Sequence, residues 1–168
     1  MDENVPEVVR DGLKRWRSVL KFLAPEFVSE VGGLIWTESH FDPEAERYEA
    51  GYRRRYLEGN SVWEKRIEDE GWSVESVASS YGLMQLMFPT AWALGYRGGP
   101  EGLKQAETSL VYGCMLFAGL FDRYGDVRSA LAAYNGGSAR KVDGIFVNQG
   151  YVDKVMRKAR ILREEGLC

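Results

Sequence analysis

Apolar residues along the chain recur mostly at intervals of three and four, the spacing that gathers side chains on one face of an α-helix. The helices predicted in this way cover residues 7–22, 25–38, 62–70, 90–94, 103–124, 126–134 and 151–165. The helix over 103–124 has the strongest apolar face and is expected to be the central buried helix, with Gly125 at its C-terminal cap and Asp126 as the next N-cap. Strand-like character is limited to Gly82–Leu86, so the pattern predicts one mainly α domain over residues 1–168 with a small irregular β element.

Glu38 is the most informative polar residue in this pattern. At about 100° per residue, it falls inside the apolar arc of its helix, between Phe27 and Val31. Because a buried carboxylate is costly to ionise unless it is paired, we expect the pKa of Glu38 to be raised, as a general acid requires. A helix-end glutamate turned to solvent is the other interpretation. His40, just beyond the helix, is expected to be exposed, and Asp42-Pro43 to form a turn.

Two charged segments are candidate surfaces. Residues 44–76 form a segment rich in arginine, glutamate and aromatic residues, which is either a solvated insertion or the wall of a cleft where aromatic rings stack on sugars. The last helix carries five basic residues that are expected to lie on its solvated side, with a contact to a wall polymer as the alternative. These five residues are Lys154, Arg157, Lys158, Arg160 and Arg163.

Composition removes several classes of function. The chain has 168 residues and a net charge of −3, so no basic excess exists to neutralise the phosphates of a nucleic acid. The apolar stretches are too short to cross a bilayer, and the acidic N-terminus does not resemble a signal peptide. Cys114 and Cys168 are expected to be free thiols, with Cys114 in the core. Neither a phosphate-binding glycine motif nor paired zinc ligands are present, so we expect no cofactor and no metal.

Carboxylate acid–base chemistry remains, and five short motifs make it specific. In chain order they are Glu38-Ser39-x-Phe41-x-Pro43, Gly82-Leu83-Met84-Gln85-Leu86-Met87, Pro89-Thr90-Ala91, Ala133-Tyr134-Asn135-Gly136-Gly137 and Tyr151-Val152-x-Lys154-Val155. With these motifs the chain resembles the catalytic domain of soluble lytic transglycosylases over roughly residues 25 to 160, and its long segment after Asp42-Pro43 is similar to that of bacteriophage members. Each motif is weak alone, but their ordered combination is specific.

The resemblance implies a lysozyme-like fold that cuts the β-1,4 bond between N-acetylmuramic acid and N-acetylglucosamine and leaves 1,6-anhydro ends. Glu38 would act first as acid and then as base, and the Tyr134 hydroxyl would point at it. The family implies substrate contacts for the following residues: Ser39, Ser80, Tyr81, Gly82, Met84, Gln85, Met87, Asn135 and Tyr151.

Two departures from the family pattern affect the substrate contacts. The stretch between Glu38 and Gln85 is longer than usual, so a family serine cannot be aligned and Ser76, Ser79 and Ser80 all remain candidates. Phe88 also intervenes before Pro89. Neither departure removes the acid/base.

Two rival functions stay open. A goose-type lysozyme-like hydrolase would share the fold but deliver water to the anomeric carbon. A glycan-binding or virion structural module would bind without cleaving. We expect a monomer that binds peptidoglycan strands. It would be either an endolysin that accumulates in a host cytoplasm before reaching the wall or a virion-associated enzyme.

Overall fold

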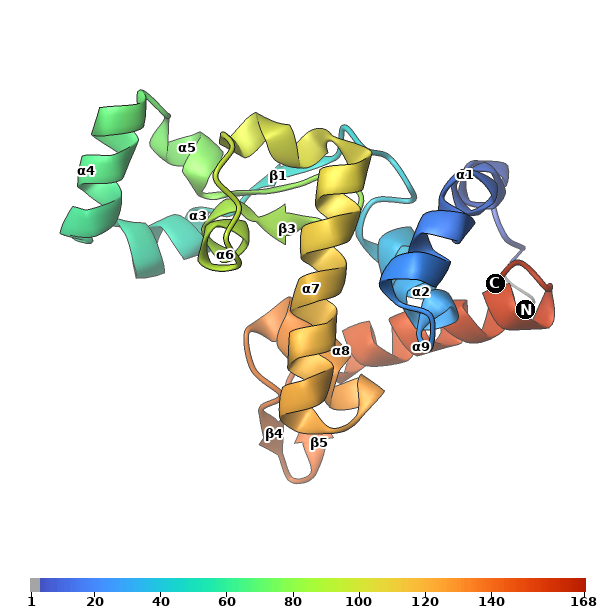
Figure 1. The fold of residues 1–168 in the computed structure, drawn as a ribbon. Helices are drawn as coiled ribbons and strands as arrows, with labels where there is room; N and C mark the ends of the chain where they lie inside the picture. Colours follow the sequence, from blue (N-terminus) through green and yellow to red (C-terminus); the bar gives the residue numbers. More distant parts are fainter. Residues whose placement is uncertain (1–3) are drawn as a thin grey trace. The chain divides into compact units, whose positions relative to one another are not determined.

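The structure is a computed structural model that describes residues 4–168, and its fold is mainly α (Figure 1). The chain divides into two units: one comprises the residues up to Phe41 together with Cys114–Cys168, and the other comprises Asp42–Gly113. The single domain predicted from the sequence therefore stays a prediction, and each unit is described by itself. Helix α7 (Ala106–Tyr124) contributes its first part to the second unit and the remainder to the first.

From residue 4 onward, the first unit contains four helices besides its part of α7, and one hairpin. These elements are α1 (Glu7–Leu23), α2 (Val28–Glu38), α8 (Val127–Gly136), β4 (Lys141–Val142), β5 (Ile145–Phe146) and α9 (Gln149–Glu164). Helix α1 is amphipathic and buries one stripe of side chains: Val9, Leu13, Trp16 and Leu20. By contrast, eight of the 11 residues of α2 are buried, as expected of a helix surrounded by other elements.

Helix α9 packs along α2, and Figure 1 shows the two side by side. A glycine at position 33 makes this approach feasible. A Cβ atom there would lie 2.8 Å from the Val155 carbonyl oxygen and 2.8 Å from the Ala159 nitrogen, distances that carbon atoms do not reach. The ends of the two helices are joined as well, because the Arg163 guanidinium donates to Glu30 and to the hydroxyl of Ser29.

The second unit combines a small sheet with short helices. Its elements are β1 (Glu46–Tyr48), α3 (Ala50–Tyr52), a π-helical turn η1 (Arg53–Leu57), α4 (Ser61–Glu70), α5 (Val74–Val77), β2 (Ser79–Tyr81), β3 (Leu86–Met87), α6 (Phe88–Ala93) and a 3₁₀ turn η2 (Pro100–Lys104). The sheet has the antiparallel order β1-β2-β3 and places Ser80 opposite both Arg47 and Met87. The predicted β element is thus the turn between β2 and β3 and its flanking strands.

The segment 44–76 is more than a solvated insertion. Trp63 and Trp72 are half-buried. Both rings pack edge to face against Phe88 and Trp92 of α6, with ring centroids 4.9–6.4 Å apart. The guanidinium of Arg66 lies 4.4 Å from the centre of the Trp92 ring. Arg54 and Arg55 are exposed, as expected of a surface arginine run over residues 53–55, whereas Arg53 is half-buried and pairs with Glu58 and Glu75. Edge-to-face aromatic packing and cation–π contacts therefore hold α4 in place.

Most predicted helices are confirmed, and the exceptions have physical reasons. Helix α2 begins at Val28 rather than at Pro25, because Pro25 and Glu26 form a turn and Phe27 has a non-helical backbone. Helix α8 continues through the predicted turn residues Asn135 and Gly136, and the following Gly137, with a φ of 76°, terminates it. The β4–β5 hairpin was not predicted.

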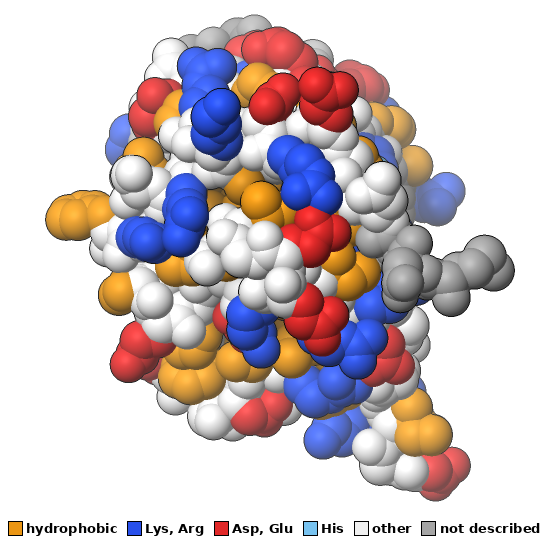
Figure 2. All heavy atoms as spheres, turned by 90° about the vertical axis from the view of Figure 1, so that its right-hand side faces the viewer, with side chains coloured by type: hydrophobic (Ala, Val, Ile, Leu, Met, Phe, Trp, Pro, Cys, Tyr) orange, Lys and Arg blue, Asp and Glu red, His pale blue; other side chains and the backbone are white. Residues whose placement is uncertain are grey.

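Both expectations about cysteine are confirmed: Cys114 and Cys168 are free, and Cys114 is buried. Burial raises the pKa of the Cys114 thiol to about 12, so this thiol stays protonated and unreactive. None of the helices within residues 4–168 is long and apolar enough to cross a membrane. On the face shown in Figure 2, basic and acidic side chains are interspersed rather than gathered into one patch.

Candidate functional site

Glu38 is the last residue of α2, and a sharp change of backbone direction follows it. His40 and Phe41 have φ values of 55° and 65°, a left-handed conformation that costs a non-glycine residue on the order of 1 kcal/mol. The Phe41 ring is 5% exposed and occupies the space beside Gly12, where a Cβ atom would lie 2.5 Å from the phenylalanine Cβ. Burial of this ring against α1 thus holds the turn that ends α2 at the glutamate.

The side chain of Glu38 is half-buried and accepts a hydrogen bond from a residue far along the chain. The Tyr151 hydroxyl donates to Glu38 Oε1 at 2.5 Å, across a separation of 113 residues. This distance is typical of an O–H···O bond to an ionised acceptor. Tyr151 lies in the first turn of α9, whose packing against α2 brings the hydroxyl to the carboxyl group. The sequence assigned Tyr151 to substrate contact, whereas the structure connects it to Glu38.

Tyr134, on α8, belongs to the same group. It is partly buried, and this burial raises the pKa of its hydroxyl well above the ordinary value; the negative charge of Glu38 is the second cause. The phenol is therefore neutral at physiological pH and close enough to the carboxyl group to respond to its charge. The first unit thus brings together a carboxyl group and two tyrosines from three different helices. The catalytic roles of Glu38 and Tyr134 stay predictions.

Asn148 fixes α8 to the start of α9. Its amide nitrogen donates to the Ala132 carbonyl and to the Asn135 side-chain oxygen, each at 2.9 Å. Asn135, which the sequence assigned to substrate contact, is exposed and already uses its oxygen in this bond. The bonds between Asn148 and α8 therefore help to place Tyr134 and Tyr151 on the same side of the first unit. Sequence reasoning missed Asn148.

Lys158 corrects the expectation of a wholly solvated basic face on the last helix. It is only 2% exposed, its ammonium donates to the Trp36 carbonyl at 3.2 Å, and it lies 4.7 Å from the Trp36 ring centre. Arg157 and Arg160, its neighbours on α9, are exposed as expected. The apolar spacing already contained the signal, because position 158 lies three residues after the buried Val155 and therefore on the face toward α2.

Ser39 is buried at the C-terminal cap of α2. Its backbone nitrogen and its hydroxyl both donate to the Ile35 carbonyl, at 3.0 and 3.3 Å. This bonding is local to the end of α2, and a contact of Ser39 with substrate stays a prediction. His40 is exposed, as expected.

Gln85 organises the predicted site residues of the second unit. Its amide nitrogen donates to the carbonyls of Ala45 and Gly82, at 2.9 and 3.1 Å, and its oxygen accepts from the Ser80 hydroxyl at 3.1 Å. The residue itself has a φ of 47°. The side chain thus satisfies polar groups of its own turn and the carbonyl of the residue before β1, while the predicted contact with sugar remains a prediction.

The other predicted residues of this unit differ in exposure. Tyr81 is buried, donates to the Ser76 carbonyl at 2.7 Å and has a pKa raised to about 12, mainly by burial. Met84 is also buried, and its backbone nitrogen donates to the Ser109 hydroxyl. Met87 is only partly buried, so it keeps surface for a ligand.

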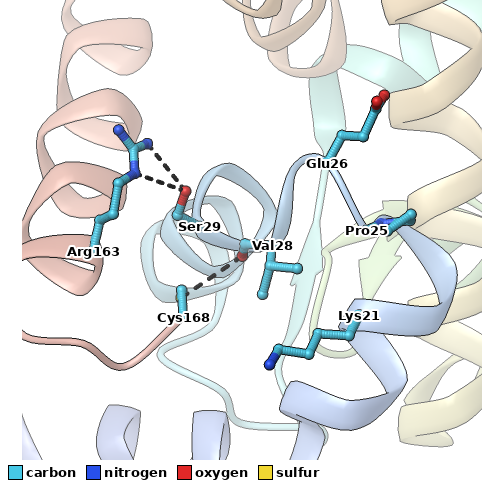
Figure 3. A pocket seen from close by; sticks show the side chains of 7 residues that line it. All are labelled: Lys21, Pro25, Glu26, Val28, Ser29, Arg163 and Cys168. Atoms are coloured by element: carbon cyan, nitrogen blue, oxygen red, sulfur yellow. Dashed lines mark hydrogen bonds between the residues drawn. The ribbon is translucent and has the colours of Figure 1, made fainter.

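Two further features do not extend this site. A pocket of about 480 Å³ lies at the opposite end of α2 from Glu38, lined by Val28, Ser29 and Arg163 among others (Figure 3). The Arg163 guanidinium there is occupied by its bonds to Ser29 and Glu30. Within residues 4–168, no three histidine, cysteine or acidic side chains are grouped as a metal site would require.

Comparison with models of known protein families identifies the family of the chain. The model of the transglycosylase SLT domain matches residues 27–150, which is most of the chain and includes Glu38, Gln85 and Tyr134. The chain belongs to the transglycosylase SLT family. No curated protein and no solved structure matches it significantly. Membership of the SLT family supports a lytic-transglycosylase-type activity on peptidoglycan. The matched stretch ends one residue before Tyr151, so the bond from Tyr151 to Glu38 is information that the structure adds.

Proposed function

We propose that this SLT domain cleaves the bond between N-acetylmuramic acid and N-acetylglucosamine and leaves 1,6-anhydro ends. The observation that carries the proposal is the hydrogen bond from Tyr151 to Glu38 within a chain of this family. A carboxyl group that is half-buried and held by a neutral phenol has the environment that acid–base catalysis requires.

The mechanism needs one carboxyl group in two roles. Protonated Glu38 gives its proton to the glycosidic oxygen, and the bond from that oxygen to the anomeric carbon breaks. The substrate's own 2-acetamido group stabilises the electron-deficient carbon. Glu38, now a carboxylate, takes the proton of the C6 hydroxyl as this oxygen bonds to the anomeric carbon. The carboxyl group is restored and no water is consumed.

The two tyrosines assist this cycle in different ways. Tyr151 holds the Glu38 carboxyl group in one orientation and stabilises it as a carboxylate, because its hydroxyl donates to Oε1. Tyr134 stays neutral because its pKa is raised, so it remains a hydrogen-bond donor throughout the working range of pH. Both phenols thus stabilise the carboxylate that Glu38 becomes when it gives its proton to the glycosidic oxygen.

The decisive experiment is mass spectrometry of purified peptidoglycan digested by the protein. Anhydro-muropeptides, lighter by one water than the products of a muramidase, are expected. Reducing muramoyl ends without that loss would instead establish a goose-type hydrolase. Binding to sacculi without release of any muropeptide would establish a glycan-binding module.

We further propose that the protein is a monomeric phage lysin. As an endolysin it would collect in the host cytoplasm before reaching the wall, and as a virion component it would arrive with the particle. The support is the resemblance of the segment 44–76 to the corresponding segment of phage members. Fractionation of an infected host, with immunoblotting of purified virions, separates the two routes. Light scattering tests the oligomeric state.

A further inference from the structure

Lys158 is a buried cation that the proposed reaction does not use. Only 2% of the residue is exposed, and lysine is almost never buried to this extent without compensation. It lies on α9, seven residues after Tyr151, which is two turns of helix. Tyr151, Val155 and Lys158 therefore share the face of α9 that packs on α2.

Three features of the surroundings favour the charged form of this lysine. The ammonium donates to the Trp36 carbonyl at 3.2 Å, in the last turn of α2. It lies 4.7 Å from the centre of the Trp36 ring, within the range of a cation–π interaction. The C-terminal end of an α-helix also carries partial negative charge, which favours a cation there.

The same helix end carries Glu38, two residues beyond Trp36. Helix α9 thus presents two donors to the last turn of α2: the Tyr151 hydroxyl reaches the carboxyl group of Glu38, and the Lys158 ammonium reaches the Trp36 carbonyl. Among the described residues, Tyr134 from α8 responds to the charge of Glu38, and Cys114 from α7 in turn affects Tyr134. His40 follows Glu38 by two residues, and the exposed Arg157 precedes Lys158 on α9.

We propose that Lys158 is an electrostatic positioning residue for Glu38: its buried ammonium secures the last turn of α2 and stabilises the carboxylate form of the glutamate. This inference rests on the proposed function, in which Glu38 must act as a base after it has donated its proton. Burial alone favours the neutral acid, and a buried positive charge opposes that effect. The two influences together allow one carboxyl group to serve in both roles.

The test compares wild-type protein with Lys158→Met, which removes the charge but keeps an unbranched side chain of similar length. Carboxyl groups are followed by ¹³C NMR in glutamate-labelled protein, and Glu38→Gln assigns the signal. Loss of the ammonium should move the titration of Glu38 to higher pH by about one unit. The alkaline limb of kcat against pH should move in the same direction, whereas KM should stay unchanged.

Two variants separate charge from packing. Lys154→Met removes an exposed lysine one turn earlier on the same helix and should leave the titration of Glu38 where it is. Lys158→Arg keeps the charge and should restore most of the wild-type titration. A purely structural lysine would lower the melting temperature of Lys158→Met without moving the titration of Glu38, and that result would overturn the proposal.

A measurement on the wild-type protein covers the case in which Lys158→Met does not fold. The side-chain ¹⁵N signal of Lys158 should show an ammonium through pH 8, and a neutral amine in that range would overturn the inference. These titrations do not require turnover. Failure of the proposed function would instead appear as the absence of anhydro-muropeptides from the wild-type digest.

Discussion

Two groups of polar residues, one in each unit, use their hydrogen bonds differently. Around Gln85, the side chain bonds Ser80 and Gly82, which are near it in sequence, and Ala45, just before β1, so the polar groups around one turn are satisfied. Around Glu38, the hydroxyl that bonds the carboxyl group comes from Tyr151, across a separation of 113 residues. The first arrangement maintains a backbone shape, whereas the second orients one ionisable side chain. Motif residues that look alike in a sequence can therefore differ in function.

The largest effect is expected from Glu38→Gln, which keeps the size of the side chain but removes the transferable proton. General acid–base groups contribute about 10²–10⁴-fold to rate, so release of muropeptides should fall by that factor. Chromatographic quantification of products per unit time measures it. The matched control is Glu26→Gln, an exposed glutamate just before α2, which should retain full activity. Undiminished release by the Glu38 variant would remove this residue from the mechanism.

The next effect distinguishes the two tyrosines. Tyr151→Phe removes the hydroxyl that donates to Glu38 and should lower kcat by about 10–100-fold, the equivalent of one hydrogen bond to a charged group. Initial rates on labelled sacculi provide the measurement, and circular dichroism checks the fold. Tyr134→Phe is the comparison and should lose less. The reverse order would make Tyr134 the principal partner of Glu38, as the motif resemblance implies.

The Gln85 network should affect stability more than chemistry. Gln85→Ala leaves two carbonyls and one hydroxyl without this partner, and each unsatisfied buried group costs about 1–3 kcal/mol. The free energy of unfolding in urea should therefore fall by about 2 kcal/mol, while kcat changes little. Gln105→Ala, at an exposed glutamine of the same unit, provides the control. If turnover falls while stability is preserved, Gln85 contacts the glycan, as the family resemblance implies.

The same contrast explains how far the sequence could predict the molecule. Periodicity placed Glu38 on the apolar side of its helix and located the caps at Gly125 and Asp126, because these features depend on neighbours within one or two turns. The bond from Gln85 to Ala45 spans 40 residues and depends on tertiary packing. No local pattern predicts it.

Two features that were not predicted could have been predicted from the sequence. Lys158 fits the apolar spacing of α9 and was assigned to solvent only because lysine is usually exposed. The β4–β5 hairpin carries Asp143-Gly144 between apolar residues, a strong hairpin signal, and both residues have the positive φ that such a turn requires. For Lys158, the residue type suggested solvent although its position in the pattern indicated burial. For the hairpin, each strand has only two residues, too few for an alternating pattern to be recognised.

The smallest predicted effect concerns the helix that carries Tyr134. The Asp126 side chain accepts from the Ser129 nitrogen at 2.8 Å and caps α8. The hydrogen bonds from Ser129 hold the pKa of this carboxyl group below its ordinary value. Because the pKa is lower in the folded state, the stabilisation is full above the unfolded pKa and is lost as the pH falls through the folded pKa.

Asp126→Ala should therefore cost about 1 kcal/mol of unfolding free energy near pH 7 and less at acid pH. Urea unfolding at a series of pH values measures both quantities. Asp126→Asn keeps a capping oxygen without the charge, so it should retain most of the stability and lose only the dependence on pH. If the alanine variant instead lost the same stability at every pH, the cap would act through its shape alone. The charge of Asp126 would then contribute nothing to placing α8.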